Sequence, residues 1–224
     1  MDLINDLIAK EILTECTNKY NLIKNDIKFI SSELGRIDKI DSWVFSYGNL
    51  FSPLLFSDEA SGMTPARRLK KKYNSPWEAR EKGVESSGFL KNMLDVVIIS
   101  TTKNDVKAPI TIITYDYNDK DIVIKTSKHF FNSENSNKPP ELIGYGILRW
   151  IDREKRMYVG VSPRGNYSII CYNYSGENVV SRYITAKDWG HTERVNFIYD
   201  DNDLMIKALA PGKNENEDVI IWSV

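Results

Sequence analysis

The residues that come closest to a catalytic pattern are Asp95, Asp121 and Lys125. Metal-dependent nucleases place an aspartate at a strand end and an acid-x-lysine motif on the next strand, so that carboxylates hold Mg²⁺ and the lysine polarises the phosphate. Asp95 opens an apolar run, and Asp121 lies four residues before Lys125, on the same strand face. The position two before the lysine is Val123, which breaks the motif. We therefore favour a charged hairpin with an exposed lysine over a nuclease site.

Other catalytic and metal-binding patterns are missing from the sequence. The two histidines, His129 and His191, belong to no HxH or HExxH motif, and the two cysteines, Cys16 and Cys171, form no CxxC pair. There is no GxSxG elbow and no glycine-rich phosphate loop. Acids cluster at Asp116/Asp119/Asp121 and at Asp200/Asp201/Asp203. Such clusters can bind calcium, but aspartates at these positions are more often turn-forming residues. The sequence predicts no catalytic residue, no metal and no cofactor.

A basic segment over residues 65–82 is the strongest candidate for a binding site. Seven basic residues and two glutamates give it a net charge of +5, whereas residues 199–224 carry six acids and two lysines. The candidate binding residues are Arg67, Arg68, Lys70, Lys71, Lys72, Tyr73, Trp77 and Arg80. Basic and aromatic side chains together hold single-stranded nucleic acid, and the charge also suits an acidic protein. The alternative is a solvated helical face without a partner.

Length and composition bound the fold. The chain has 224 residues, a net charge of −1, 27% charged and 42% hydrophobic residues, which are ordinary globular values. They exclude a wholly disordered chain, a collagen-like fibre and a globally basic nucleic-acid coat. The apolar runs are shorter than the ~18–20 residues of a membrane span, and the first residues do not resemble a secretory signal. We expect reduced thiols and a cytoplasmic or particle-associated protein without a membrane partner.

Residues 1–42 are predicted to form an N-terminal amphipathic helix. Apolar residues recur in steps of three and four at Leu13, Cys16, Tyr20, Ile23, Ile27, Ile30, Leu34 and Ile37. Two arrangements would cover this stripe: docking on the chain's own body, or a coiled-coil stem in a trimer. Leu22 and Phe29 widen the stripe beyond a narrow seam, so we expect docking.

Residues 43–92 are predicted to be a connecting region with two short basic helices. Thr64-Pro65 and Ser75-Pro76 each offer a hydroxyl N-cap followed by proline at the first helical position. Glu78, three residues after Ser75, completes a capping box. We expect helices near 65–73 and 76–82, with Gly83 ending the second.

Residues 93–224 are predicted to be an antiparallel β domain. Ten strands begin with Leu94–Ser100 and end with Val219–Val224, and most are separated by turn sequences such as Asn118-Asp119-Lys120. Gly144 and Gly146 inside one strand indicate a bulge or bend. The fold class is thus α+β, with a C-terminal antiparallel meander that is sandwich-like or barrel-like.

These observations favour a non-enzymatic binding or structural protein. One setting is a subunit of a phage or viral particle, or of another larger assembly, with self-association or a protein partner. An alternative is a soluble intracellular partner protein, of the immunity or anti-defence type, that acts through the basic segment. Nucleic acid is a further partner that residues 65–82 could contact, and a metal-dependent nuclease is the third hypothesis.

Overall fold

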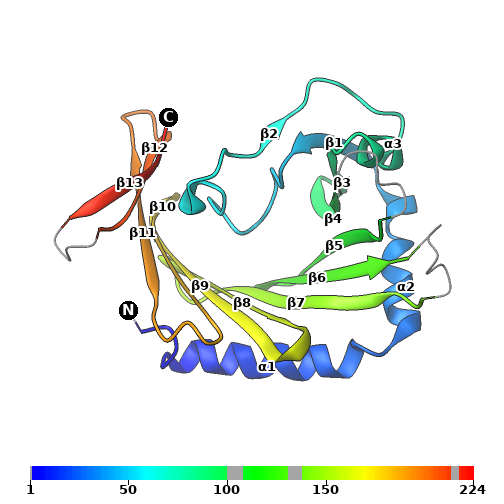
Figure 1. The fold of residues 1–224 in the computed structure, drawn as a ribbon, viewed down its shortest axis with the longest axis horizontal. Helices are drawn as coiled ribbons and strands as arrows, with labels where there is room; N and C mark the ends of the chain where they lie inside the picture. Colours follow the sequence, from blue (N-terminus) through cyan, green and yellow to red (C-terminus); the bar gives the residue numbers. More distant parts are fainter. Residues whose placement is uncertain (1, 100–107, 131–137, 213–216) are drawn as a thin grey trace.

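The computed structural model describes residues 2–99, 108–130, 138–212 and 217–224. Within these residues, thirteen strands form one fully antiparallel sheet that follows the chain from β13 to β3 and then reaches β1 and β2 (Figure 1). The strands are β1 Ser42–Tyr47, β2 Arg67–Arg68, β3 Glu85–Leu90, β4 Met93–Ile99, β5 Ile110–Tyr117, β6 Asp121–His129, β7 Glu141–Trp150, β8 Lys155–Ser162, β9 Asn166–Ser175, β10 Asn178–Ala186, β11 Glu193–Tyr199, β12 Met205–Pro211 and β13 Asp218–Ser223.

The predicted meander is confirmed, but the expectation of a sandwich or barrel is wrong. One open sheet curls around itself, and its two ends, β2 and β13, do not pair (Figure 1). β-bulges bend individual strands and so add to the curl of the sheet. One bulge places Ile143 as the extra residue of β7, because Thr126 pairs with Gly144 whereas Ser127 pairs with Leu142. Turn sequences specify each hairpin, but closure depends on the sum of twist and bend over all the strands.

The region between the N-terminal helix and the predicted β domain contributes three strands to the same sheet. β1 pairs with β3 on one side and with the two-residue β2 on the other. The helix expected near 65–73 is therefore wrong: Arg67 and Arg68 are extended, and the Leu69 amide donates to the Phe45 carbonyl at 2.9 Å. Pairing with β1 satisfies backbone groups that a helix would satisfy internally.

The second short helix of this region is confirmed as α3, Pro76–Glu81. The Ser75 hydroxyl accepts a hydrogen bond from the Glu78 amide at 3.1 Å, and the Glu78 carboxylate accepts one from the Asn74 amide at 2.9 Å. The capping residues therefore work much as the sequence predicts. The described part of the chain also contains three 3₁₀ turns: η1 Ile37–Lys39, η2 Glu59–Ser61 and η3 Pro163–Gly165.

The N-terminal segment forms two helices rather than one: α1, Leu7–Ile23, and α2, Ile27–Leu34. Asp6 and Asp26 supply their N-caps, and the Asp26 carboxylate accepts from the Phe29 amide at 2.9 Å. The first helix ends at Ile23, and the capping Asp26 starts the second. The helical phase is reset there, so Ile27 is 50% exposed although Ile30 is fully buried.

Docking of the N-terminal helix on the chain's own body agrees with the structure. α1 lies along the outer side of the sheet, against β7 and β8 (Figure 1). Its buried residues Ile12, Cys16 and Tyr20 share one core cluster with Met157 and Val159. Burying a large aliphatic side chain in this way contributes about 1.5–3 kcal/mol. We call the sheet face under α1 the convex face.

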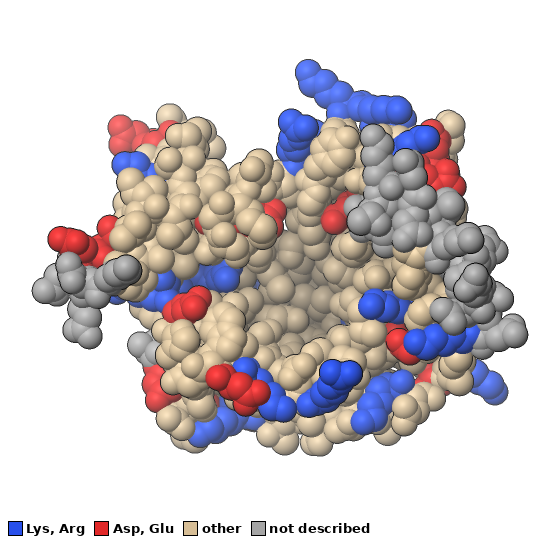
Figure 2. Space-filling view, viewed as in Figure 1, with Lys and Arg blue, Asp and Glu red and all other residues tan. Residues whose placement is uncertain are grey.

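The opposite, concave face is covered by the chain between β1 and β2. Residues of this segment, 48–66, pack onto the sheet: the Phe51 ring meets Phe89 at 5.0 Å, and the Phe56 ring meets Phe197 at 5.0 Å. Leu54 contacts the clusters at both ends. Figure 2 shows that the molecule is hollowed between this segment and the central strands. The segment therefore bridges the two arms of the curled sheet.

Candidate functional site

The basic segment lies at the β2 end of the sheet, and most of its side chains face solvent. Figure 2 shows Lys and Arg side chains projecting at the top of the view, over the elements labelled β2 and α3 in Figure 1. We define the basic strip by its exposed cations, which are Arg67, Arg68, Lys70, Lys71, Lys72 and Lys82. Among the described residues, none of these six forms an ion pair with a carboxylate within 4.0 Å.

Aromatic rings in and beside the segment already contact other side chains of the same chain. The Arg67 guanidinium lies 5.4 Å from the centre of the Tyr47 ring, and the Lys71 ammonium lies 4.7 Å from that of Tyr73. Tyr73 is half-buried and meets the Phe45 ring edge-on at 5.1 Å. Trp77, by contrast, is 37% exposed. The strip thus offers open charge, while two of the aromatic rings beside it each have a cation of the chain over them.

Arg80, predicted as a binding residue, does not belong to the exposed strip. It is 6% exposed, and its guanidinium donates a hydrogen bond of 2.6 Å to the Ala108 carbonyl. It lies on the inner side of α3, next to the buried Ala79. The sequence could not separate Arg80 from its neighbours, because a six-residue helix gives little periodicity from which to infer its buried side.

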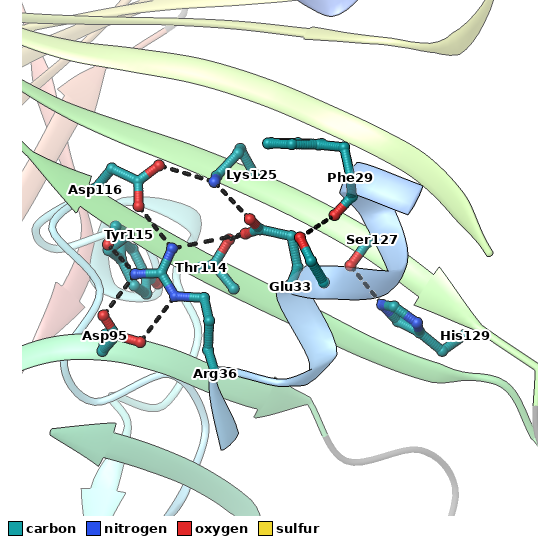
Figure 3. A network of polar contacts seen from close by, with 11 residues as sticks. Phe29, Glu33, Arg36, Asp95, Thr114, Tyr115, Asp116, Lys125, Ser127 and His129 are labelled. Atoms are coloured by element: carbon teal, nitrogen blue, oxygen red, sulfur yellow. Dashed lines mark hydrogen bonds and ion pairs between the residues drawn. The ribbon is translucent and has the colours of Figure 1, made fainter. Parts of the chain in front are cut away.

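The nuclease candidates Asp95 and Lys125 do lie near one another, but each is held by residues of the N-terminal segment (Figure 3). The Arg36 guanidinium donates to both oxygens of Asp95, at 2.9 Å from Nε and 2.5 Å from Nη2. The Lys125 ammonium is 2.9 Å from the Glu33 carboxylate and 2.8 Å from that of Asp116. Lys125 is 5% exposed, which corrects the exposed lysine expected from the sequence.

The network closes on itself beneath α2 (Figure 3). Asp116 lies 2.6 Å from Arg36 as well as beside Lys125, and Glu33 accepts a short hydrogen bond from the Thr114 hydroxyl. Burial raises the pKa of the Asp116 carboxyl, but the Lys125 and Arg36 cations outweigh burial and hold it below its usual range. The arrangement joins α2 to strands β4, β5 and β6. It contains three acids and two cations, and each cation is paired with at least two of the acids.

Backbone geometry explains how Asp95 reaches this network. Phe89 pairs with Leu94 and Gly88 with Val96, so Asp95 is the extra residue of a bulge in β4. A bulge re-aims the side chain that it carries. Sequence reasoning missed Glu33 and Arg36, because both lie within a segment whose apolar stripe dominates the pattern.

Asp121, the third nuclease candidate, is engaged elsewhere. Its carboxylate accepts two hydrogen bonds from Arg149, at 2.7 and 2.9 Å, and the same guanidinium reaches Glu15 of α1 at 3.0 Å. The Arg149 hydrogen bonds lower the pKa of the Asp121 carboxyl. These contacts tie α1 to the sheet, so the three nuclease candidates do not converge on one site.

The histidines and cysteines are dispersed. His129 is buried with its Nε2 2.9 Å from the Ser127 hydroxyl, and burial lowers its pKa. His191 is exposed, and its Nδ1 lies 2.7 Å from the Trp189 carbonyl. Both cysteines are free and buried, and burial raises the pKa of Cys16 to about 12 and that of Cys171 to about 11. Thiols with such pKa values are poor nucleophiles.

The second acidic cluster behaves as the sequence predicts for turn residues, whereas Asp116 and Asp121 of the first form the ion pairs described above. The Asp200 carboxylate accepts from the amides of Asn202 and Leu204, both at 2.9 Å. In the first cluster, the Asn118 side chain accepts from the Lys120 and Asp121 amides. Over the described residues, no group of three or more His, Cys, Asp or Glu side chains is arranged to hold a metal ion.

No family model matches the chain, and neither a curated protein nor a solved structure is significantly similar. Among the helices that the structure describes, none is long and apolar enough to span a membrane.

Proposed function

We propose that this chain is a non-enzymatic binding or structural protein that uses the basic strip to contact an acidic protein surface. The observation that carries the proposal is the contrast between cations. Lys125, Arg36 and Arg149 face carboxylates within the fold, whereas the six cations of the strip are exposed and, among the described residues, unpaired. Clustered charge that the fold does not use raises the association rate with a surface of opposite sign.

An acidic protein fits the strip better than single-stranded nucleic acid does. Binding of single strands needs open aromatic faces on which bases stack. Here the Lys71 cation lies over Tyr73 and the Arg67 cation over Tyr47, whose side chain is otherwise 46% exposed, and Trp77 is 37% exposed without a cation over its ring among the described residues. We therefore propose an acidic protein as the partner, and the binding experiment distinguishes it from nucleic acid.

A larger assembly is the setting that we propose for this contact, for example a phage or viral particle. The described residues of the acid-rich part of the chain, 199–224, include strands β12 and β13, which lie at the far end of the sheet from β2 (Figure 1). The two ends of one molecule are thus opposite in charge, and a second copy could present the acidic surface. The alternative is a monomer that binds an unrelated acidic protein, as an immunity or anti-defence factor would.

The test replaces Arg67, Arg68 and Lys71 with glutamate in one variant. Each of these side chains is exposed, so melting should barely change, at about 0.5 kcal/mol or less per substitution. Poly-glutamate binding, measured by titration at low and at physiological salt, should be salt-sensitive in the wild type and lost in the variant. A control variant that changes Lys19, Lys28 and Arg153 to glutamate carries the same change in net charge at exposed positions elsewhere. It should keep most of the binding.

The outcomes separate the hypotheses. Equal loss in both triple variants would show that only net charge matters and would overturn the assignment to the strip. Unfolding of the strip variant would show that these residues are structural. Oligothymidylate binding that exceeds poly-glutamate binding and needs the strip would favour nucleic acid. Native mass measurement then distinguishes a self-assembling subunit from a monomeric partner protein.

A further inference from the structure

Four residues with alternating chemistry form a row across the concave face. Trp150 of β7 pairs with Arg156 of β8, Arg156 pairs with Tyr172 of β9, and Tyr172 pairs with Arg182 of β10. Their sequence neighbours Met157 and Cys171 pack against α1 on the convex face. Because successive side chains of a strand point to opposite faces, the row lies on the side of the sheet away from α1.

Arg182 is a buried cation without an acid beside it. It is 6% exposed, and its hydrogen bond to the Phe56 carbonyl is at the 3.5 Å limit. Its Nε has no partner, and among the described residues no carboxylate comes within 4.0 Å. Burial lowers the pKa of this guanidinium, with Tyr172 and the more distant, exposed Glu193 acting against that shift. Burying an unpaired charge is costly.

The neighbours of Arg182 in the row also carry unused hydrogen-bonding groups. The Tyr172 side chain is 1% exposed, and its hydroxyl has no partner; the Nε of Arg156 has none either. Native proteins pair the large majority of buried polar atoms. Three orphaned donors on three adjacent strands therefore form a cluster that the fold itself does not satisfy.

The outer end of the row is open and aromatic. Trp150 is 44% exposed, the Arg156 guanidinium lies 5.0 Å from its ring centre, and the Tyr174 ring lies 4.9 Å from it. Burial raises the pKa of Tyr174, and the Arg156 cation acts in the opposite direction. A small molecule could thus reach Arg156 from solvent, with Tyr172 and Arg182 deeper beneath the 48–66 segment.

We propose that Arg156, Tyr172 and Arg182 form a binding site for a phosphate group of a small molecule. Guanidinium groups and a hydroxyl donate to phosphate oxygens, and the planar fork of arginine matches their geometry. Arg156 and Arg182 stand two strands apart, about 10 Å between backbones, and Tyr172 lies between them on the same face of the sheet. A bound phosphate would supply the negative charge that Arg182 lacks. This site is separate from the basic strip, and it goes beyond the proposed function.

The first test compares Arg182→Met and Tyr172→Phe with the wild-type full chain. Binding of inorganic phosphate and of pyrophosphate is measured by calorimetric titration. We expect affinity to fall about tenfold or more in Arg182→Met and by a smaller factor in Tyr172→Phe. Without ligand, both variants should melt at or above the wild-type temperature, because each removes a polar group that has no full set of partners.

Arg149→Met provides the matched control. Arg149 lies on β7 and faces Asp121 and Glu15, so its loss should lower the melting temperature and leave phosphate affinity unchanged. The proposal is overturned if the wild type binds neither phosphate nor pyrophosphate, or if Arg182→Met binds them as the wild type does. Binding of citrate in preference to both phosphates would show that the anion is a carboxylate, which also contradicts the proposal.

Discussion

Arg36 and Asp95, 59 residues apart in the sequence, form a two-pronged ion pair between the end of α2 and a bulge in β4. The same guanidinium donates to the Tyr115 carbonyl at 2.8 Å and lies 2.6 Å from Asp116. Burial alone would lower the pKa of Arg36, but these two aspartates raise it above its ordinary value. The pair thus fastens the N-terminal helices to the strands that carry the nuclease candidates Asp95 and Lys125.

Replacing Asp95 with asparagine should destabilise the fold and have no effect on nucleic acid. The variant keeps the side-chain shape but removes the charge that Arg36 meets, which should cost about 1–3 kcal/mol in the free energy of unfolding. Urea denaturation measures this loss.

Incubation with single- and double-stranded nucleic acid plus Mg²⁺ or Mn²⁺ provides the second readout for Asp95. Both substrates should stay intact with the wild type as with the variant. Cleavage by the wild type that Asp95→Asn abolishes would restore the nuclease hypothesis.

Two isoleucines of α2 should respond very differently to aspartate. Ile30 is fully buried, so Ile30→Asp places an unpaired charge in the core and should cost about 3 kcal/mol or more. Ile27 is half exposed at the first position of the helix, where an acid also interacts well with the helix dipole. Ile27→Asp should change stability by about 0.5 kcal/mol or less. Similar large losses in both variants would mean that both isoleucines lie on one continuous buried stripe, and this would contradict the break between the two helices at Asp26.

Glu85 should make the fold less stable as the pH rises through neutrality. Burial, with a contribution from Asp58, raises the pKa of its carboxyl to about 7. The folded state then holds the proton more tightly than the unfolded state, whose value is near 4.5. The contribution of Glu85 to stability is therefore complete below about pH 4.5 and is lost as the pH rises from there through about 7, by about 1–2 kcal/mol once solvent screening is allowed for.

The check is chemical denaturation of the wild type and Glu85→Gln at about pH 5 and pH 8. Glu85→Gln should lose the dependence on pH over this interval, whereas Glu81→Gln, at an exposed position of α3, should keep it. If the difference in the free energy of unfolding between these two pH values is the same in Glu85→Gln as in the wild type, another group is responsible for it.

Local sequence patterns specify most of the individual strands and turns of the fold. The predicted strand Ile110–Tyr117 is β5, and most other predicted strands differ from the observed ones by one to three residues at each end. Alternating apolar residues and turn-forming Asn, Asp and Gly act over fewer than ten residues or so, and each hairpin is specified within that distance. The Ser75-Pro76 helix start and the bulge beside Gly144 are local in the same sense.

Tertiary structure alone decided which distant residues meet. Glu33 and Lys125, 92 residues apart, form a buried pair because curling of the sheet brings β6 beneath α2. Nothing near Lys125 in the sequence marks it as buried, just as nothing near Arg182 marks it as a cation without an acid. Likewise, β1, β2 and β3 join the sheet through pairings between distant segments. The sequence of each segment alone does not indicate these pairings. Burial and charge pairing depend on the whole packed chain, so local patterns cannot specify them.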